Sequence, residues 1–149
     1  MSRPKMSRLL AGAALLAGLV AGAPAVASAE PVTTLAGCVG SSCTGKNPNT
    51  LGCGNDAYTV ATKVPGTGGP MVELRYSPAC QAYWARFESP VDINWRIRVQ
   101  GRKSDGTYVT YLANGSPKSQ PYTLMVGTDL PARACVEDYF GTWHCTAWY

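Results

Sequence analysis

Alternation of apolar and polar residues recurs along the second half of the chain and predicts short β-strands. The pattern is clearest over residues 91–99, where one face holds Val91, Ile93, Trp95, Ile97 and Val99. Charged and polar residues fill the alternate positions. A period of two residues over this length fits a half-buried strand and is hard to fit to a helix. We therefore predict a strand from Val91 to Val99, with Trp95 in the core.

Other segments are rich in β-branched and aromatic residues and are separated by turn signals. They are residues 57–64, 71–76, 107–113, 122–126, 133–137 and 142–149. Asp105-Gly106 predicts a hairpin, because this pair tolerates the positive φ of a tight turn. Residues 78–87 fit either one or two helical turns or an irregular strand. The sequence thus predicts an all-β fold: a small disulfide-stapled sandwich or partly open barrel of about seven short strands, with room for one short helix.

Residues 1–29 have the form of a secretory signal peptide. Basic residues (Arg3, Lys5 and Arg8) precede an uncharged apolar run, and Ala27-Ser28-Ala29 supplies the small residues that a signal peptidase needs. The run is too short, and too diluted by Gly and Ala, to be a membrane anchor. We predict cleavage after residue 29, a secreted protein, and no membrane attachment of the mature chain.

A second processing site competes with this one. Leu35-Ala36-Gly37-Cys38 is similar to the lipobox of a bacterial lipoprotein, in which the cysteine is acylated. However, Glu30 and Pro31 separate the motif from the apolar run, and lipidation would leave an odd number of cysteines. We expect Cys38 to form a disulfide, and a lipid anchor at Cys38 is the alternative.

The mature chain divides by composition into two parts that we expect to pack as one domain. Residues 30–56 are rich in Gly, Ser, Thr, Asn and Cys and predict an irregular segment pinned by disulfides, whereas residues 57–149 hold the predicted strands. Three of the 13 Lys and Arg residues lie in the signal, so ten remain against nine Asp and Glu. The net charge is then about +1 instead of +4, which gives no reason to expect nucleic-acid binding.

All six cysteines follow the predicted signal: Cys38, Cys43, Cys53, Cys80, Cys135 and Cys145. Fifteen pairings are possible. The turn-like residues 140–142 favour a Cys135–Cys145 bridge, and the other four would then pair among themselves. An exported chain meets an oxidising environment, which favours disulfides. The Cys38–Cys43 spacing and a single histidine, His144, are marginal for zinc. We expect no metal and no cofactor.

Residues 38–87 carry a pattern that reads C-x4-C-T-G-K-N-P, then G-C-x-x-D-A, then V-E-L-R-Y-S-P-A-C, then W-A-R. This pattern resembles an uncharacterised family of exported domains in actinobacteria and some bacilli, the YjfA-like family. Four cysteines fall on the family's positions, namely Cys38, Cys43, Cys53 and Cys80, while Asn47 stands where the family usually has Asp. The resemblance implies disulfide use and export, and in some relatives an extracytoplasmic sensing or binding part. It implies no activity.

Residues that could support catalysis are few. His144 is the one histidine, and no G-x-S-x-G elbow is present. Carboxylates that could act in glycoside hydrolysis are Glu73, Glu88, Asp92, Glu137 and Asp138. The sequence places no two of them at the required separation, and Glu73 can instead pair with Arg75 or Arg86. We expect no catalytic residue and no enzyme.

Arginine and tryptophan are better leads for binding. Arg96 and Arg98 begin a basic stripe that continues to residues 102–103. This stripe could bind anionic cell-wall polymers, or it could be a solvated strand face. We expect Trp143 in the core, and Trp148 on the opposite strand face, exposed for stacking on a ligand. The predicted binding residues are Arg75, Trp84, Arg86, Arg96, Arg98 and Trp148.

These features favour a small secreted binding protein without catalytic activity. Its partner would be an extracellular protein or a cell-wall glycan, and not nucleic acid. Two alternatives remain open. One is an inhibitor of an extracellular hydrolase that presents the loop over residues 41–53, and the other is a small hydrolase.

Overall fold

The structure, a computed structural model, describes residues 35–66 and 68–149, so the predicted signal peptide and its cleavage site lie outside the described residues. A short 3-10 helix, η1 (Gly40–Cys43), precedes the strands. The strands are β1 (Tyr58–Lys63), β2 (Val72–Ser77), β3 (Ala82–Phe87), β4 (Arg96–Arg102), β5 (Tyr108–Asn114), β6 (Val126–Gly127), β7 (Ala132–Glu137) and β8 (Trp143–Cys145). No helix in these ranges is long and apolar enough to span a membrane.

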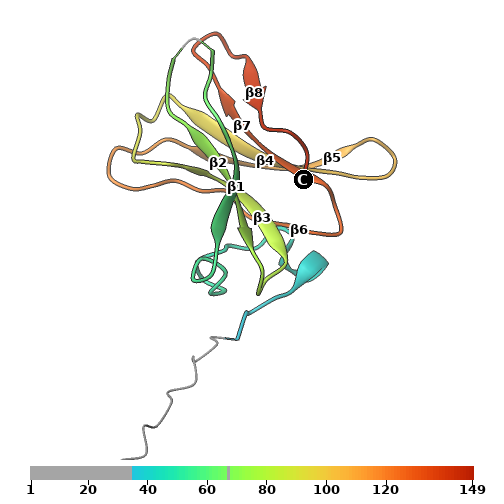
Figure 1. Cartoon of the computed structure of the whole chain (residues 1–149). Coiled ribbons are helices and arrows are strands. Elements are labelled where there is room, and N and C mark those ends of the chain that lie inside the picture. The colour runs from blue at the N-terminus through green and yellow to red at the C-terminus, as the bar shows by residue number, and fades with distance from the viewer. Residues whose placement is uncertain (1–34, 67) are drawn as a thin grey trace, which may run out of the picture. The chain divides into compact units, whose positions relative to one another are not determined.

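The described strands form two antiparallel four-stranded sheets, ordered β1-β2-β3-β6 and β5-β4-β7-β8 (Figure 1). Neither sheet closes on itself. The prediction of a disulfide-stapled all-β fold is therefore confirmed as a sandwich, with eight strands in place of about seven. The hairpin at Asp105-Gly106 is also confirmed: Gly106 has φ +84°, and Asp105 Oδ1 accepts the Thr107 N–H at 2.9 Å.

The two sheets pack face to face because alternate residues of their central strands are apolar. Fully buried core residues come from both sheets: Val72, Leu74, Ala85 and Phe87 from β2 and β3, and Ile97, Val99, Ala134 and Val136 from β4 and β7. The residues between them must point the other way, since side chains alternate along a strand. Each sheet therefore has an outer face, and both outer faces carry arginines.

A second buried cluster covers part of the outer face of the β1-β2-β3-β6 sheet. It contains Cys38, Cys43, Cys53, Cys80, Ala82, Trp84 and Met125. Disulfides join Cys38 to Cys43 and Cys53 to Cys80. The Gly40 N–H also donates to the Cys80 carbonyl at 2.8 Å. The irregular segment is thus held against the sheet by covalent and hydrogen bonds together.

The predicted strand from Val91 to Val99 is wrong in its first half. β4 begins only at Arg96, and Ile93, which we placed on the apolar face of the predicted strand, is 67% exposed. Asp92 forms a turn here: its side chain accepts the Asn94 N–H at 3.0 Å and its carbonyl accepts the Trp95 N–H at 3.2 Å. Trp95 is buried, as predicted. Alternation in residues 91–95 therefore accompanies a turn, and the strand lies beyond it.

Two weaker predictions are also resolved. Residues 82–87 form a strand, so the helical alternative for that segment is wrong. The strand predicted over residues 122–126 is reduced to one isolated bridge between Arg86 and Tyr122 and the two-residue strand β6.

Candidate functional site

The six predicted binding residues separate onto the outer faces of the two sheets. Arg75, Trp84 and Arg86 lie on β2 and β3, where Arg75 pairs with Trp84 across the strands. Arg96 and Arg98 lie on β4 in the other sheet, and Trp148 lies on that sheet's outer face. The residues therefore do not share one cleft, and the protein has two candidate surfaces.

The first surface is a pocket of about 340 Å³ on the outer face of β2 and β3, which we call the Arg75 pocket. Its lining residues are Asn49, Gly54, Arg75, Trp84, Arg86, Ser119, Gln120 and Tyr122. Trp84, which we predicted as a binding residue, is only 3% exposed, so its ring is not open to a ligand. The reason is that the disulfide-pinned segment covers the sheet face on which Trp84 lies.

Polar groups around the Arg75 pocket hydrogen-bond to one another, except Arg75 Nε, which is buried without a partner. Glu73 accepts hydrogen bonds from Arg86 Nε at 2.8 Å and from the Thr59 hydroxyl at 2.8 Å. Arg75 donates to Thr59 Oγ1 at 2.7 Å and to the Ala57 carbonyl at 2.6 Å. The pKa of Arg75 is lowered, first by burial and then by the nearby Arg86. Of the two partners predicted for Glu73, the structure selects Arg86.

The second surface is the outer face of the β5-β4-β7-β8 sheet, which we call the arginine–aromatic face. Its members are Arg96, Arg98, Arg102, Tyr108, Arg133, Trp143 and Trp148. The guanidinium carbon of Arg98 lies 4.1 Å from the centroid of the Trp143 ring. Arg102 and Arg133 lie 4.9 Å and 4.4 Å from the centroid of the Trp148 ring. Positive groups and rings thus alternate across the sheet at cation–π distances.

Both tryptophans of the last segment lie on this face, which corrects two predictions. We placed Trp143 in the core, but it is half-buried beneath Arg98. We also expected Trp143 and Trp148 on opposite faces. β8 ends at Cys145, and the Thr146 hydroxyl then accepts the Ala134 N–H at 3.2 Å in place of a ladder bond. The strict alternation is lost there, and Trp148 returns to the side of Trp143.

Positive charge on this face exceeds negative charge. Within the outward positions of the described strands, Glu137 is the one carboxylate, and Arg96 donates to both of its oxygens. Arg133 Nε donates to the neutral side chain of Gln100 at 3.0 Å. The pKa of Arg98 is lowered, first by burial and then by repulsion from Arg133. Among the described residues, Arg98, Arg102 and Arg133 therefore stack on rings and form no ion pair, and Glu137 acts on Arg98 only through a longer-range attraction.

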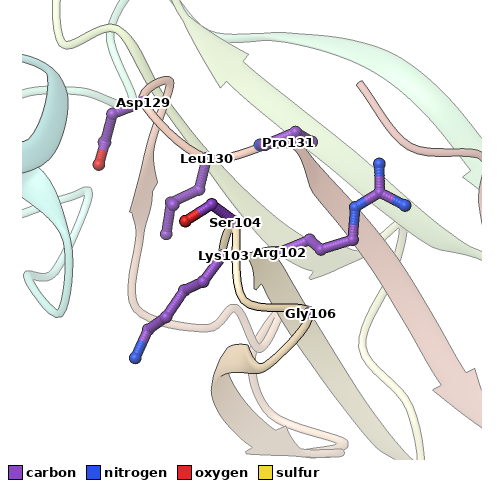
Figure 2. A pocket seen from close by; sticks show the side chains of 7 residues that line it. All are labelled: Arg102, Lys103, Ser104, Gly106, Asp129, Leu130 and Pro131. Carbon is purple, nitrogen blue, oxygen red and sulfur yellow. The ribbon is translucent and has the colours of Figure 1, made fainter.

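A pocket of about 480 Å³ adjoins one end of the arginine–aromatic face. It is lined by Arg102, Lys103, Ser104, Gly106, Asp129, Leu130 and Pro131, from the β4–β5 turn and the loop before β7. Figure 2 shows the Arg102 and Lys103 side chains extending in opposite directions. Arg102 thus belongs both to the pocket and to the face, and it makes the two surfaces continuous.

The cysteines are all used in disulfides. The bridge between Cys135 and Cys145 is confirmed and joins β7 to β8. The sulfurs of Cys38, Cys43, Cys53 and Cys80 lie within 4.8 Å of one another, a distance at which four thiolates could hold a metal. Here they form two disulfides, so reduction would have to come first. The lipid-anchor alternative needs the sulfur of Cys38, which the bridge to Cys43 occupies. Three bridges are typical of a protein from an oxidising environment.

Comparison with known families gives one result. A family described as a protein of unknown function, DUF2690, matches residues 41–135. The chain belongs to the DUF2690 family. Searches of curated proteins and of solved structures gave no match. The DUF2690 match spans the Arg75 pocket and the arginines of the second surface, whereas Trp143 and Trp148 follow it. Membership supplies no activity.

His144 pairs with Asp138 at 2.8 Å. Asp138 also accepts the N–H groups of Phe140 at 2.9 Å and Thr142 at 2.8 Å. The His144 hydrogen bond is the main cause that lowers the pKa of the Asp138 carboxyl. The pair therefore holds the turn between β7 and β8, next to the Cys135–Cys145 bridge.

Four members of the arginine–aromatic face were missing from the predicted binding residues. Arg102 was named only as part of the basic stripe, and Tyr108, Arg133 and Trp143 were not predicted to bind at all. Each lies on a different strand or hairpin arm, so no local pattern connects them. The only sequence signal would have been the strand order, which brings residues 108, 133 and 143 to one face of one sheet.

Proposed function

We propose that this DUF2690 chain is a secreted, non-catalytic module that binds an anionic glycan of the cell envelope. The observation that supports this most directly is the alternation of arginines and aromatic rings on one open sheet face. Secretion by the predicted signal peptide and the narrower YjfA-like relationship belong to the same proposal. Export and three disulfides fit a protein that meets the cell wall.

The two residue types on this face suit the two chemical parts of an anionic glycan, its charged groups and its sugar rings. Guanidinium groups form directional, bidentate hydrogen bonds with carboxylates and phosphates. Aromatic rings such as Trp148 offer a flat apolar surface to a sugar. Stacking on Trp143 and Trp148 also limits the motion of Arg98, Arg102 and Arg133 before any ligand arrives, which reduces the entropy lost on binding.

The adjoining pocket gives the face a defined end. Lys103 is exposed and lines this pocket, and its ammonium group can attract a terminal carboxylate or phosphate as a point charge. By contrast, the loop over residues 41–53, which an inhibitor would have to present to a hydrolase, is hydrogen-bonded to the rest of the domain. The Gly45 N–H donates to the Met125 carbonyl and the Met125 N–H to the Lys46 carbonyl, both at 2.9 Å.

The proposal is tested by co-sedimentation of the mature chain with purified cell-wall sacculi, either with their phosphate-bearing polymers intact or after acid extraction of those polymers. We expect retention on intact sacculi at physiological salt, and its loss after extraction or at high salt, because exposed charges are screened. Trp148→Ala should weaken binding about tenfold, as expected for an aromatic anchor at the centre of a binding surface.

Lys118→Ala is the matched control, because Lys118 is exposed and lies on the loop beside the Arg75 pocket, away from the arginine–aromatic face. This variant should bind like the wild type. Retention that survives removal of the anionic polymers, or that falls equally in both variants, would contradict the proposal.

A further inference from the structure

The four edge strands of the sandwich differ in how they protect their unpaired backbone groups. β6 and β8 are very short, with two and three residues. β1 has a register shift between Thr59 and Ala61 and carries Lys63. Short length, bulges and lysines are the usual ways to prevent pairing at a sheet edge. Three of the four edges are therefore protected.

β5 has none of these protections. It is seven residues long and keeps an unbroken register with β4, from Tyr108 opposite Arg102 to Asn114 opposite Arg96. Its sequence, YVTYLAN, contains no charged residue and no proline. Leu112 is 57% exposed and Tyr108 is 47% exposed. A regular, uncharged edge of this length is a template for another strand.

The hairpin geometry identifies the free backbone groups. At one end the Lys103 N–H donates to the Thr107 carbonyl, and at the other the Gly115 N–H donates to the Trp95 carbonyl. Hydrogen-bonded pairs recur every second residue in an antiparallel ladder, so the odd-numbered residues of β5 bond to β4. The residues that direct N–H and C=O groups away from β4 are Tyr108, Thr110, Leu112 and Asn114. Across residues 35–66 and 68–149, β5 has no other strand partner.

We propose that β5 pairs with β5 of a second copy of this chain, antiparallel about a two-fold axis normal to the sheet. With the axis at Tyr111, Thr110 faces Leu112 of the second copy and Tyr108 faces Asn114. The free N–H and C=O groups of Tyr108, Thr110, Leu112 and Asn114 in each copy then have hydrogen-bond partners in the other copy. The same contacts occur twice, as two-fold symmetry requires.

A second copy fits this edge because nothing on it repels itself. The outward side chains of β5 are uncharged, and the nearest arginines lie one strand further in, on β4. The β4 strands of the two copies would be separated by three strand spacings, about 14 Å. This exceeds the Debye length of about 8 Å at physiological salt, so repulsion between the two sets of arginines is screened.

The pairing also has a consequence for glycan binding. This consequence rests on the proposed function, whereas the pairing itself does not. Residues that pair across antiparallel strands point to the same face, so the two arginine–aromatic faces would lie on the same side of one continuous sheet. A polymer that crosses both would bind bivalently, and its avidity would exceed the affinity of either face alone.

Sedimentation equilibrium of the mature chain over a range of concentrations, without any polymer, tests the pairing. We expect a reversible monomer–dimer equilibrium. Thr110→Pro removes an outward N–H that makes no bond to β4, so the hairpin can stay intact while the dimer loses two symmetry-related hydrogen bonds. We expect its dissociation constant to rise roughly thirtyfold. Leu112→Lys, which places two ammonium groups near the two-fold axis, should weaken the dimer most at low salt.

Thr110→Val is the matched control, because it changes the same side chain and keeps the backbone N–H; its dimer should match that of the wild type. Near-ultraviolet circular dichroism confirms that each variant is folded. A wild-type chain that stays monomeric at millimolar concentration would overturn the proposal. So would a dimer that withstands either Thr110→Pro or Leu112→Lys, since its interface would then lie elsewhere.

Discussion

The outer faces of the two sheets carry the same residue types and use them differently. Both place arginines beside tryptophan. On β2 and β3, Arg86 is paired with Glu73, Arg75 is bonded to neutral oxygens, and loops cover the surface. On the β5-β4-β7-β8 sheet, aromatic rings lie beside the arginines instead of carboxylates and loops. Among the described residues of this face, Arg96 is the arginine that forms an ion pair.

The difference shows that an arginine's neighbours, more than its presence, decide what it can do. A guanidinium that lies against a buried carboxylate has most of its hydrogen-bonding capacity in use, and its charge is neutralised. A guanidinium stacked on a ring keeps its charge and its edge N–H groups for an incoming anion. We therefore assign a structural role to the Arg75 pocket network and a binding role to the arginine–aromatic face.

The largest expected effect comes from removing the bridge that holds the covering segment. Cys53→Ala with Cys80→Ala opens a loop with a sequence separation of 27, and the chain-entropy relation gives a loss of about 3.5 kcal/mol in the free energy of unfolding. The matched pair, Cys135→Ala with Cys145→Ala, has a separation of 10 and should lose about 2.7 kcal/mol. Urea unfolding measures both. A larger loss of unfolding free energy on removing Cys135–Cys145 than on removing Cys53–Cys80 would contradict this prediction.

A smaller loss is expected from Glu73→Gln, which leaves Arg86 without its carboxylate. The Glu73 and Arg86 side chains are 11% and 27% exposed, so the cost should fall below that of a fully buried pair, at about 2 kcal/mol. Glu88→Gln is the control, because Glu88 is exposed in the same region, and its effect should stay within about 0.5 kcal/mol. Chemical denaturation compares the two. Equal losses would mean that the Glu73 network contributes no more than surface charge.

How much of this comparison the sequence could predict depends on the range of the interactions. Local signals predicted the hairpin at Asp105-Gly106, a strand over residues 71–76 that the structure has at Val72–Ser77, and the Cys135–Cys145 bridge, because each depends on residues close together along the chain. The same reasoning failed at Ile93, where alternation continues through a turn fixed by Asp92. Period alone does not distinguish a strand from a polar-capped turn that happens to alternate.

The two surfaces depend on contacts between distant segments, which one sequence does not encode in any local pattern. Trp84 lies at an outward position of its strand, as a surface residue would. It is buried because the segment held by the Cys53–Cys80 bridge covers that side of the sheet. Trp148 and Arg133 meet because β7 lies between β4 and β8. The residue types of both surfaces could therefore be predicted, but their grouping could not.

The turn beside the open face gives a pH-dependent test. The folded pKa of Asp138 is lowered below its usual 3.8, so the carboxylate stabilises the folded state fully above that value. This stabilisation is lost as the pH falls through the lowered pKa. Asp138→Asn should therefore be less stable than the wild type at pH 7, by less than Glu73→Gln, and the gap should narrow toward pH 2. Thermal unfolding at both pH values measures this. A gap that is equal at both would assign the effect to the shape of the turn and not to its charge.

The smallest expected effect discriminates most directly between the faces, because it is measured as a change in binding. Glu137→Gln removes the one carboxylate among the outward strand positions of the arginine–aromatic face and frees Arg96. Retention on intact sacculi should then tighten about threefold at low salt and return toward wild type as salt rises, because the freed Arg96 side chain is 51% exposed and its charge is screened by salt. Glu88→Gln makes the same charge change outside that face and should leave retention unchanged. Equal tightening in both variants would mean that net charge drives binding, and weaker binding in Glu137→Gln would mean that Glu137 holds Arg96 in place for the ligand.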